Sequence, residues 1–527
     1  MTSVSASKKD VIIIGGGLAG LTLAHQLKQS QAELDILVVE RNTFPVPEKT
    51  AKVGESTVEI GSRYLKHTLG LSDHFDERHL RKHGLRCFFG TPQDDFSQHD
   101  ELGVSELFGL PTYQIDRGAI ENYLSQLVMA EGVELIDGAT IANISVGERQ
   151  KIIKLNAADG ERTFCSPWIV DAAGRQAILK NKLDLHKTNQ HKGNAIWFRI
   201  DRQVKLDSWS KNDQWQQRIK QPDTRWLSTN HLMGPGYWVW VIPLDNGATS
   251  IGVVMDDQAF QANDFSNYEA TFRWLQTHHP HCAQAIEGAD VLDYVVINDY
   301  SLSCKQMFSD QGWGLTGESG VFADPFYSPG TDFIAFNNSF INDLIVKDFN
   351  GADIRFDSRL FQSISQSVFD STLSLYSGQY GGFGDRRMMS LKLVWDYAYY
   401  WGVLSLLFFK SAMTDIEMMR ELNPIMRRAQ QANFKVQASF RIRAAQRLTL
   451  PAVGVFMNQF EVPCLKYFNQ VLDTKDGPST QQSLQVNVDL LERIALHISD
   501  MLDSNANNKI CDDERELFGD YRHSVLA

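Results

Sequence analysis

Hydrophobic and polar positions follow different periodicities along the chain. In residues 1–185, short apolar runs typical of buried strands alternate with helical patterns, as they do in α/β nucleotide-binding domains. Residues 186–300 contain extended segments rich in Trp, Ile and Val, among them 195–200 and 237–242, which predict an antiparallel sheet. Beyond residue 350, apolar residues recur every three to four positions, which predicts a helical region from 351 to 527.

The first apolar run is followed by a glycine-rich turn. Residues 11–14 lead into Gly15-Gly-Gly17-Leu18-Ala19-Gly20 and then into a helical pattern. Gly15 permits a tight turn, Gly17 lets the backbone approach a pyrophosphate, and Gly20 lets the helix pack closely on the strand. These positions are typical of the opening of a dinucleotide-binding unit.

A second apolar run, 34–39, completes that unit. It ends in Glu40, whose carboxylate can accept hydrogen bonds from an adenosine ribose, and Arg41 follows. Strand, glycines, helix, second strand and terminal acid occur in the required order, which makes the motif far more specific than the glycines alone. We therefore predict a Rossmann-like dinucleotide site with Gly15, Gly17, Leu18, Ala19, Gly20, Glu40 and Arg41 around the cofactor.

Length, charge and cysteine usage narrow the class of protein. A chain of 527 residues is too long for one core and indicates several domains or subdomains. The 51 Lys and Arg residues against 64 Asp and Glu give a formal charge of −13, which argues against binding to nucleic acid or anionic membranes. Six scattered cysteines without a C-x-x-C pair favour reduced thiols over disulfides or a zinc site.

Two further segments bear on location and on metals. The apolar run 393–409 is interrupted by Asp396 and is short for a membrane span, so we expect a core or interface helix. Residues 1–10 are polar and carry no apolar signal segment, which predicts a cytoplasmic protein. Adjacent histidines at 278, 279 and 281 would point to opposite faces of an extended segment, so we expect a surface loop there and no metal.

Three later segments decide which dinucleotide is bound. Asp171 and Gly174 lie in a turn after the apolar run 168–170, Glu318 and Pro325 lie in a second such turn, and Arg117 opens a helical pattern. These segments resemble the flavin-contacting segments of the p-hydroxybenzoate-hydroxylase-like flavoproteins, which usually carry Asp where this chain has Glu318. The resemblance implies FAD, and an α/β fold in which residues 1–185 and 301–350 form a Rossmann-like FAD-binding domain around an antiparallel substrate domain at 186–300.

Three motifs resemble those of the flavin-dependent halogenases. They are Trp238-Val-Trp240-Val-Ile-Pro243, Phe322-Ala-Asp-Pro325-Phe-Tyr-Ser328-Pro-Gly330, and Gly54-Glu55-Ser56 followed by Lys82 ahead of an aromatic strand. The resemblance extends from Val11 to about Ile345.

That resemblance implies a mechanism and roles. A separate flavin reductase supplies reduced FAD, O2 and halide yield hypohalous acid, and Lys82 delivers it to an electron-rich aromatic ring. Trp238 and Trp240, two residues apart on one strand, share a face and would separate the flavin from the substrate. The turn from Ser328 to Gly330 would hold an anion on backbone N–H groups, Glu55 would shape the flavin site, and Ser56, Pro243 and Phe322 would complete the cofactor site and tunnel.

Two departures from the family pattern keep other functions open. Tyr327 stands where tryptophan-specific members carry Glu, which favours phenol- or pyrrole-type substrates. Pro329 stands where Thr or Ser is usual, and proline has no N–H, so a halide site would lose a donor worth roughly 1–3 kcal/mol. Halogenation, flavin-dependent monooxygenation without halide, and an accessory role on a protein partner in cofactor maturation all fit the sequence.

The partners follow from the same alternatives. We expect a flavin reductase and an aromatic small molecule, either free or bound to a carrier protein, or a protein substrate. Between residues 422 and 460 the chain has six basic residues and no acidic one. This run fits a solvated helical face or a docking surface for an acidic partner.

Overall fold

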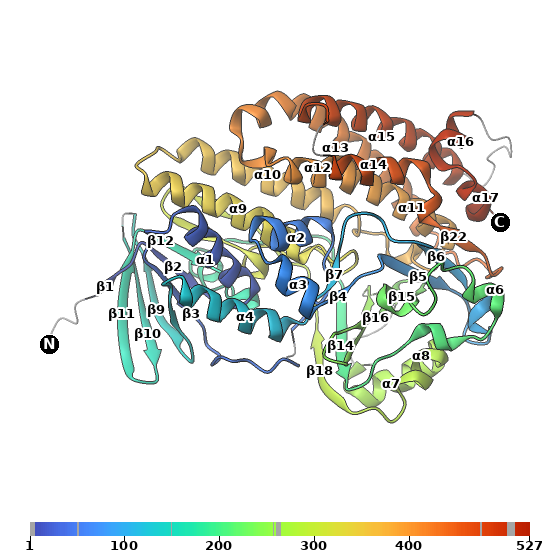
Figure 1. The fold of residues 1–527 in the computed structure, drawn as a ribbon, viewed down its shortest axis with the longest axis horizontal. Helices are drawn as coiled ribbons and strands as arrows, with labels where there is room; N and C mark the ends of the chain where they lie inside the picture. The colour runs from blue at the N-terminus through green and yellow to red at the C-terminus, as the bar shows by residue number, and fades with distance from the viewer. Residues whose placement is uncertain are drawn as a thin grey trace. The chain divides into compact units, whose positions relative to one another are not determined.

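A computed structural model describes residues 6–49, 52–148, 150–256, 258–259, 265–474, 477–502 and 512–526. Contacts divide the chain into two units, each assembled from three segments. Unit 1 comprises residues 1–78, 115–189 and 301–370, and unit 2 comprises residues 79–114, 190–300 and 371–527. The α/β class predicted from the sequence is confirmed, because unit 1 carries a parallel sheet with helices and unit 2 a largely antiparallel sheet (Figure 1).

Unit 1 is built on a six-stranded sheet. In spatial order its strands are β20 (Phe308–Ser309), β21 (Trp313–Leu315), β12 (Trp168–Asp171), β2 (Val11–Ile14), β3 (Ile36–Val39) and β8 (Glu134–Ile136). All neighbours are parallel except β20 and β21. The strands β2, β3 and β12 are fully buried, which explains why their sequences are continuous apolar runs.

Helices and a second sheet complete unit 1. The glycine turn opens α1 (Leu18–Ser30), which packs against α4 (Arg117–Ala130) and α9 (Gly330–Phe349). Shorter helices are α2 (Glu59–Arg63), α3 (Ser72–Arg78) and α5 (Ile178–Lys182). The second sheet has the order β1 (Ser7–Lys8), β11 (Gly160–Ser166), β10 (Lys151–Ala157) and β9 (Thr140–Val146) (Figure 1).

Unit 2 contains an eight-stranded sheet. Its order is β18 (Val291–Ile297), β14 (Asn194–Ile200), β17 (Thr249–Met255), β16 (Tyr237–Pro243), β15 (Thr229–Gly234), β5 (Leu85–Phe89), β6 (Asp100–Gly103) and β22 (Phe456–Asn458). Neighbours are antiparallel except β15 with β5 and β6 with β22. The expected strands 195–200 and 237–242 are β14 and β16, so the predicted antiparallel sheet is confirmed.

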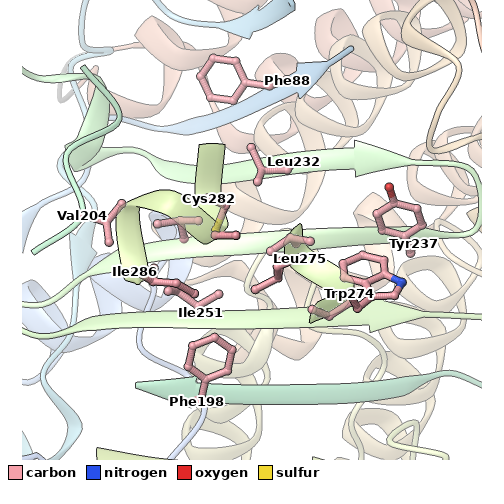
Figure 2. Close-up of a cluster of buried hydrophobic side chains, with 14 of the residues drawn as sticks. Phe88, Phe198, Val204, Leu232, Tyr237, Ile251, Trp274, Leu275, Cys282 and Ile286 are labelled. Atoms are coloured by element: carbon pink, nitrogen blue, oxygen red, sulfur yellow. The ribbon is translucent and has the colours of Figure 1, made fainter. Parts of the chain in front are cut away.

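One face of this sheet packs against α7 (Tyr268–His278) and α8 (Pro280–Ile286) around an apolar core. Figure 2 shows Leu275, Cys282 and Ile286 from these helices over strands that carry Leu232 and Ile251. Because side chains alternate along a strand, the tryptophans at 238 and 240 lie on the opposite face from this core. Sequence alternation on β16 thus separates the face that packs on α7 and α8 from the face that carries the two tryptophans.

The C-terminal part of unit 2 is helical, as predicted. Its main helices are α11 (Arg386–Tyr399), α12 (Leu406–Phe409), α13 (Ile416–Ala444), α14 (Pro463–Asp473), α15 (Thr480–Leu502), α16 (Asp512–Phe518) and α17 (Tyr521–Leu526). Before them, α10 (Arg355–Leu373) follows α9, and α13 lies beside α15 (Figure 1). The apolar run 393–409 falls in buried turns of α11 and α12, and among the described residues no helix is long and apolar enough to cross a membrane.

Candidate active site

The glycine turn of unit 1 leaves room for a ligand at one position only. Gly15 has a φ of +107°, and an added Cβ there would lie 2.4 Å from the Ala172 carbonyl oxygen. A Cβ on Gly20 would lie 1.9 Å from the Gly15 oxygen, whereas a Cβ on Gly17 would have Glu121 Oε1 as its nearest atom, at 3.9 Å. Gly15 and Gly20 are therefore required by packing, and Gly17 borders open space.

That space lies at the start of a helix. α1 begins at Leu18, has no side-chain cap at Gly17 and has no acidic residue in its first turn. The first N–H groups of a helix have no partner within it and favour an anion. The turn therefore fits the pyrophosphate of FAD, with Leu18 and Ala19 supplying backbone beside it.

The carboxylate of Glu40 is held in place at the end of β3. Its Oε2 accepts a hydrogen bond from the Gly16 N–H at 2.7 Å, and its Oε1 accepts one from the Asn42 N–H at 2.9 Å. Glu40 is buried, whereas Arg41 is exposed. The glycine turn and the terminal acid thus form one connected structure, which fits the predicted ribose contact.

Asp171 organises the turn after β12. Its two carboxylate oxygens accept the N–H groups of Ala173 at 3.0 Å and Leu179 at 2.6 Å, and its side chain is fully buried. Burial raises the pKa of Asp171 to about 6, against the opposing effect of these hydrogen bonds. Gly174, in the same turn, has a φ of +60° and nothing near its Cβ position. The geometry supports a positioning role for Asp171 and leaves the backbone at Gly174 approachable.

Arg117 joins two predicted parts of the flavin site. Its guanidinium donates to the Val53 carbonyl oxygen at 2.5 Å and pairs with Glu121 at 2.8 Å. The Ile115 N–H donates to the Glu55 carbonyl oxygen at 2.6 Å, and both Glu55 and Ser56 are buried. The 53–56 segment and the start of α4 are therefore held together within unit 1.

Glu318 makes a contact that the sequence did not reveal. Its carboxylate pairs with Arg175 at 2.8 Å, and both side chains are about one-third exposed. The Arg175 guanidinium also lies 5.4 Å from the ring centre of Phe322, within cation–π range. Glu318 thereby links its own turn to the turn after β12, the two turns that resemble flavin-contacting segments.

The predicted anion turn has an unusual backbone. Tyr327 and Ser328 have φ values of 70° and 58°, a left-handed conformation that non-glycine residues rarely adopt. The Ser328 N–H donates to the Pro325 carbonyl oxygen at 3.0 Å, and Pro329 has no N–H. Gly330 opens α9, where the first N–H groups lack partners within the helix. Of the three motif positions, only Gly330 therefore keeps a backbone donor for an anion.

Lys82 is buried in unit 2, with a relative exposure of 2%. The backbone N–H of Lys82 donates to the Thr112 carbonyl oxygen at 2.8 Å, which continues the pairing of β4 (Leu80–Arg81) with β7 (Tyr113–Gln114). His231, on β15, is also buried, and desolvation together with the nearby charge of Lys82 lowers its pKa to about 3. Lys82 therefore lies beside an imidazole that stays neutral at physiological pH. Its burial is unusual, because most lysine side chains are exposed to solvent.

The two motif tryptophans lie side by side on β16. Their ring centres are 5.7 Å apart, and the ring of His231 lies 5.2 Å from that of Trp238. The Trp240 N–H donates to Ser250 Oγ at 3.1 Å. Gly252, opposite Trp240 on β17, makes room for the indole, because a Cβ there would lie 2.2 Å from that ring. Pro243 ends the strand and pairs with Thr249.

Comparison with known proteins agrees with this geometry. The FAD binding domain family matches residues 8–294, more than half of the chain. The chain belongs to this family. Within it, the chain is 24% identical over 428 residues to the flavin-dependent halogenase chlA of Dictyostelium discoideum, covering 75% of this chain and 70% of that protein. It is 26% identical over 353 residues to a 1H-pyrrole-2-carbonyl-[peptidyl-carrier protein] chlorinase of Pseudomonas fluorescens, covering 63% and 74%.

A solved structure shows the same fold. The crystal structure of halogenase PltM in complex with phloroglucinol and FAD matches with a TM-score of 0.66 and 17% identity, over 98% of this chain and 99% of that one. The predicted resemblance to the flavin-dependent halogenases is therefore confirmed, and the protein is an FAD-dependent oxidoreductase that is similar to them.

In this FAD-binding protein, half of the basic residues in the run 422–460 have acidic partners. Arg428 pairs with Asp489 at 2.8 Å, Arg443 with Asp385 at 2.7 Å and Arg447 with Asp256 at 3.2 Å. Half of these positive charges are therefore paired within unit 2, and the docking surface for an acidic partner stays a prediction.

Proposed function

We propose that this protein halogenates an electron-rich aromatic ring, with Lys82 as the residue that delivers the halogenating species. The burial of Lys82 beside a neutral histidine carries this proposal. A lysine in an ordinary loop would extend its ammonium into water, whereas a buried amine is available as a hydrogen-bond donor or as a nucleophile toward hypohalous acid. The motif residues Trp238 and Trp240 belong to the same unit as Lys82. They are the other side chains that we expect around the aromatic ring of the substrate.

Each residue of the proposed cofactor site would have a distinct role. Reduced FAD would supply the two electrons that activate O2. Gly17 and the start of α1 would bind the pyrophosphate, Glu40 would bind the ribose, and Arg117 would hold the 53–56 segment against the cofactor. Trp238 and Trp240 would exclude water from the ring and keep the oxidant from attacking it directly.

A phenol- or pyrrole-type substrate is the class best supported. One relative is a chlorinase of a pyrrolyl group on a peptidyl-carrier protein, and one solved neighbour was crystallised with phloroglucinol. Tyr327 in place of the acid used by tryptophan-specific members agrees with this choice. Whether the ring is free or bound to a carrier protein is decided by offering both forms to the enzyme.

We further propose that a separate reductase in the cytoplasm reduces the FAD. The test combines the purified protein with a generic flavin reductase, NADH, FAD and a panel of phenols and pyrroles, with and without chloride or bromide. Halide-dependent product supports the proposal, and halide-independent hydroxylated product contradicts it. Fast, substrate-stimulated NADH oxidation by the protein alone would contradict the need for a reductase.

Oxidation without halide is the second candidate, and Pro329 favours it. If halide binds at this turn, Pro329→Ala restores a backbone N–H and should lower the KM for halide about tenfold, since a hydrogen bond to a charged group contributes roughly 1.5–3 kcal/mol. Pro329→Ser is a second test of the same idea, because it adds the same N–H together with a hydroxyl. An unchanged KM for halide in both variants would place halide binding elsewhere or support monooxygenation.

A further inference from the structure

A glycine-rich segment, residues 377–384, connects α10 to α11 in the C-terminal region. It contains Gly378, Gly381, Gly382 and Gly384 around Tyr380. Sequence motifs of the FAD and halogenase type end near residue 345, so they assign this segment no role. Its contacts within unit 2, however, lead to the strand that carries the two motif tryptophans.

The backbone of this segment packs directly on the turn between β15 and β16. The Gly236 N–H donates to the Tyr380 carbonyl oxygen at 2.9 Å. A Cβ on Gly384 would lie 2.8 Å from the Pro235 nitrogen and 3.2 Å from the Gly234 carbonyl carbon, so no larger residue fits there without a shift. The turn that precedes Trp238 is thereby fixed from outside the sheet.

The side chain of Tyr380 reaches the tryptophan itself. The Trp238 indole N–H donates to Tyr380 Oη at 3.1 Å, and Tyr380 Oη lies 2.9 Å from Tyr300 Oη. Tyr300 Oη in turn lies 3.5 Å from His191 Nε2. Because an indole N–H can only donate, Tyr380 accepts from Trp238 and can donate its own proton to Tyr300, which can donate to His191. All four side chains are buried, so the chain of contacts is shielded from water.

The other side of the segment packs on the end of α13. A Cβ on Gly381 would lie 2.6 Å from the Ala444 carbonyl oxygen, and one on Gly382 would lie 3.1 Å from the Ala444 Cα. Ion pairs hold this end in place, Arg443 with Asp385 and Arg447 with Asp256. The glycines therefore let a thin piece of chain lie between a long helix and the strand turn.

From these contacts we propose that the C-terminal helical region positions the tryptophan strand, and that Tyr380 is a positioning residue acting through Trp238. Trp240 is held differently, by Ser250 on the neighbouring strand. The indole N–H of Trp240 thus bonds to a residue of the sheet, and that of Trp238 bonds to a residue of the C-terminal region. The catalytic consequence rests on the proposed function: with Trp238 free to turn, the oxidant is less well contained and less of it reaches the substrate.

The test compares Tyr380→Phe with Ser250→Ala in the full-length protein loaded with FAD. In [15N]Trp-labelled protein, the Trp238 indole resonance is identified by its loss in Trp238→Phe. We expect Tyr380→Phe to shift that resonance and to accelerate its hydrogen exchange at least tenfold, and Ser250→Ala to shift the Trp240 resonance instead. Product formed per O2 consumed should fall severalfold in Tyr380→Phe, with flavin binding unchanged.

Each result decides the proposal. An unmoved Trp238 resonance overturns the positioning contact, and a moved resonance with unchanged product per O2 overturns its role in the reaction. If Tyr380→Phe does not fold, Tyr300→Phe removes only the second link and should shift the same resonance by a smaller amount. If the wild type yields an oxidised but unhalogenated product, the proposed halogenation fails, while product per O2 still tests the positioning role.

Discussion

At the scale of single residues, the glycine turn separates a folding requirement from a binding requirement. Gly17→Val should leave the protein folded but abolish FAD binding, because its Cβ position is open in the protein and would be filled by the pyrophosphate. Absorbance of the bound flavin after gel filtration measures retention, and thermal unfolding measures the fold.

The control for this prediction is Gly20→Val, where the Cβ would meet the Gly15 oxygen. It should lower the unfolding temperature even without FAD, as a backbone clash in a packed turn requires. Normal flavin content in folded Gly17→Val would contradict the assignment of the turn.

Several of these residues were predictable from sequence, and others were not. Gly15, Gly20 and Glu40 were predictable because their roles depend on neighbours within one local unit. His231 and Gly252 were missed, because each matters through a residue that is distant or unlinked in the local pattern, Lys82 for His231 and Trp240 for Gly252. The alternation of residues along a strand specifies the face of the sheet on which a side chain lies, but not the residues that it contacts on other strands.

At the scale of elements, β16 and β17 form one tightly fitted pair. Gly252→Val should destabilise the protein by roughly 1–3 kcal/mol and displace the Trp240 indole, since its Cβ would overlap the ring. Urea unfolding and tryptophan fluorescence measure both effects. Gly109→Val is the matched control, because Gly109 is exposed and its Cβ would have only an Asn469 oxygen at 3.9 Å. Equal stability of the two variants would contradict the fit.

The extent of the sheet could be predicted only in part. Strands β14 and β16 lie within a residue of the predicted segments, because their alternation is strong. The sheet also includes β5 and β6, from residues 85–103, which the sequence analysis placed with the first domain. The parallel pairing of β15 with β5 joins residues more than 140 positions apart, and no local pattern specifies such a partner. The predicted domain boundaries remain predictions.

At the scale of the whole molecule, His231, which is buried, and His279, which is half-buried, make stability depend on pH. Desolvation lowers the pKa of both His231 and His279 to about 3. Between that value and the ordinary value of 6.5, the unfolded chain binds more protons than the folded one, so stability falls as pH decreases. From pH 7 to 5 the loss is about 2 kcal/mol per histidine, while Asp171, whose pKa is raised to about 6, opposes it.

A difference between variants isolates the histidine effect. His279→Gln should lose about 2 kcal/mol less than the wild type between pH 7 and 5, because Asp171 contributes equally to both. Urea unfolding at the two pH values gives the comparison. An equal loss in both proteins would show that His279 is not kept neutral by burial.

The helical region shows what a sequence leaves open at this scale. Its 3.6-residue periodicity predicted helices at 351–527, but periodicity does not indicate the function of these helices. The contacts of Tyr380 and the glycines of residues 377–384 suggest one, because they reach the strand of motif tryptophans. Such contacts arise from the topology of unit 2, in which residues 190–300 and 371–527 fold together.

The central claim is that Lys82 delivers the halogenating species, and Lys82→Ala tests it most directly. With a generic flavin reductase, halide and a substrate of the wild type, the variant should bind FAD and consume O2 as the wild type does but form no halogenated product. Lys82→Arg should also fail, because a guanidinium stays protonated, and the exposed neighbour variant Arg81→Ala should retain activity. Halogenated product from Lys82→Ala at the wild-type rate would contradict the account.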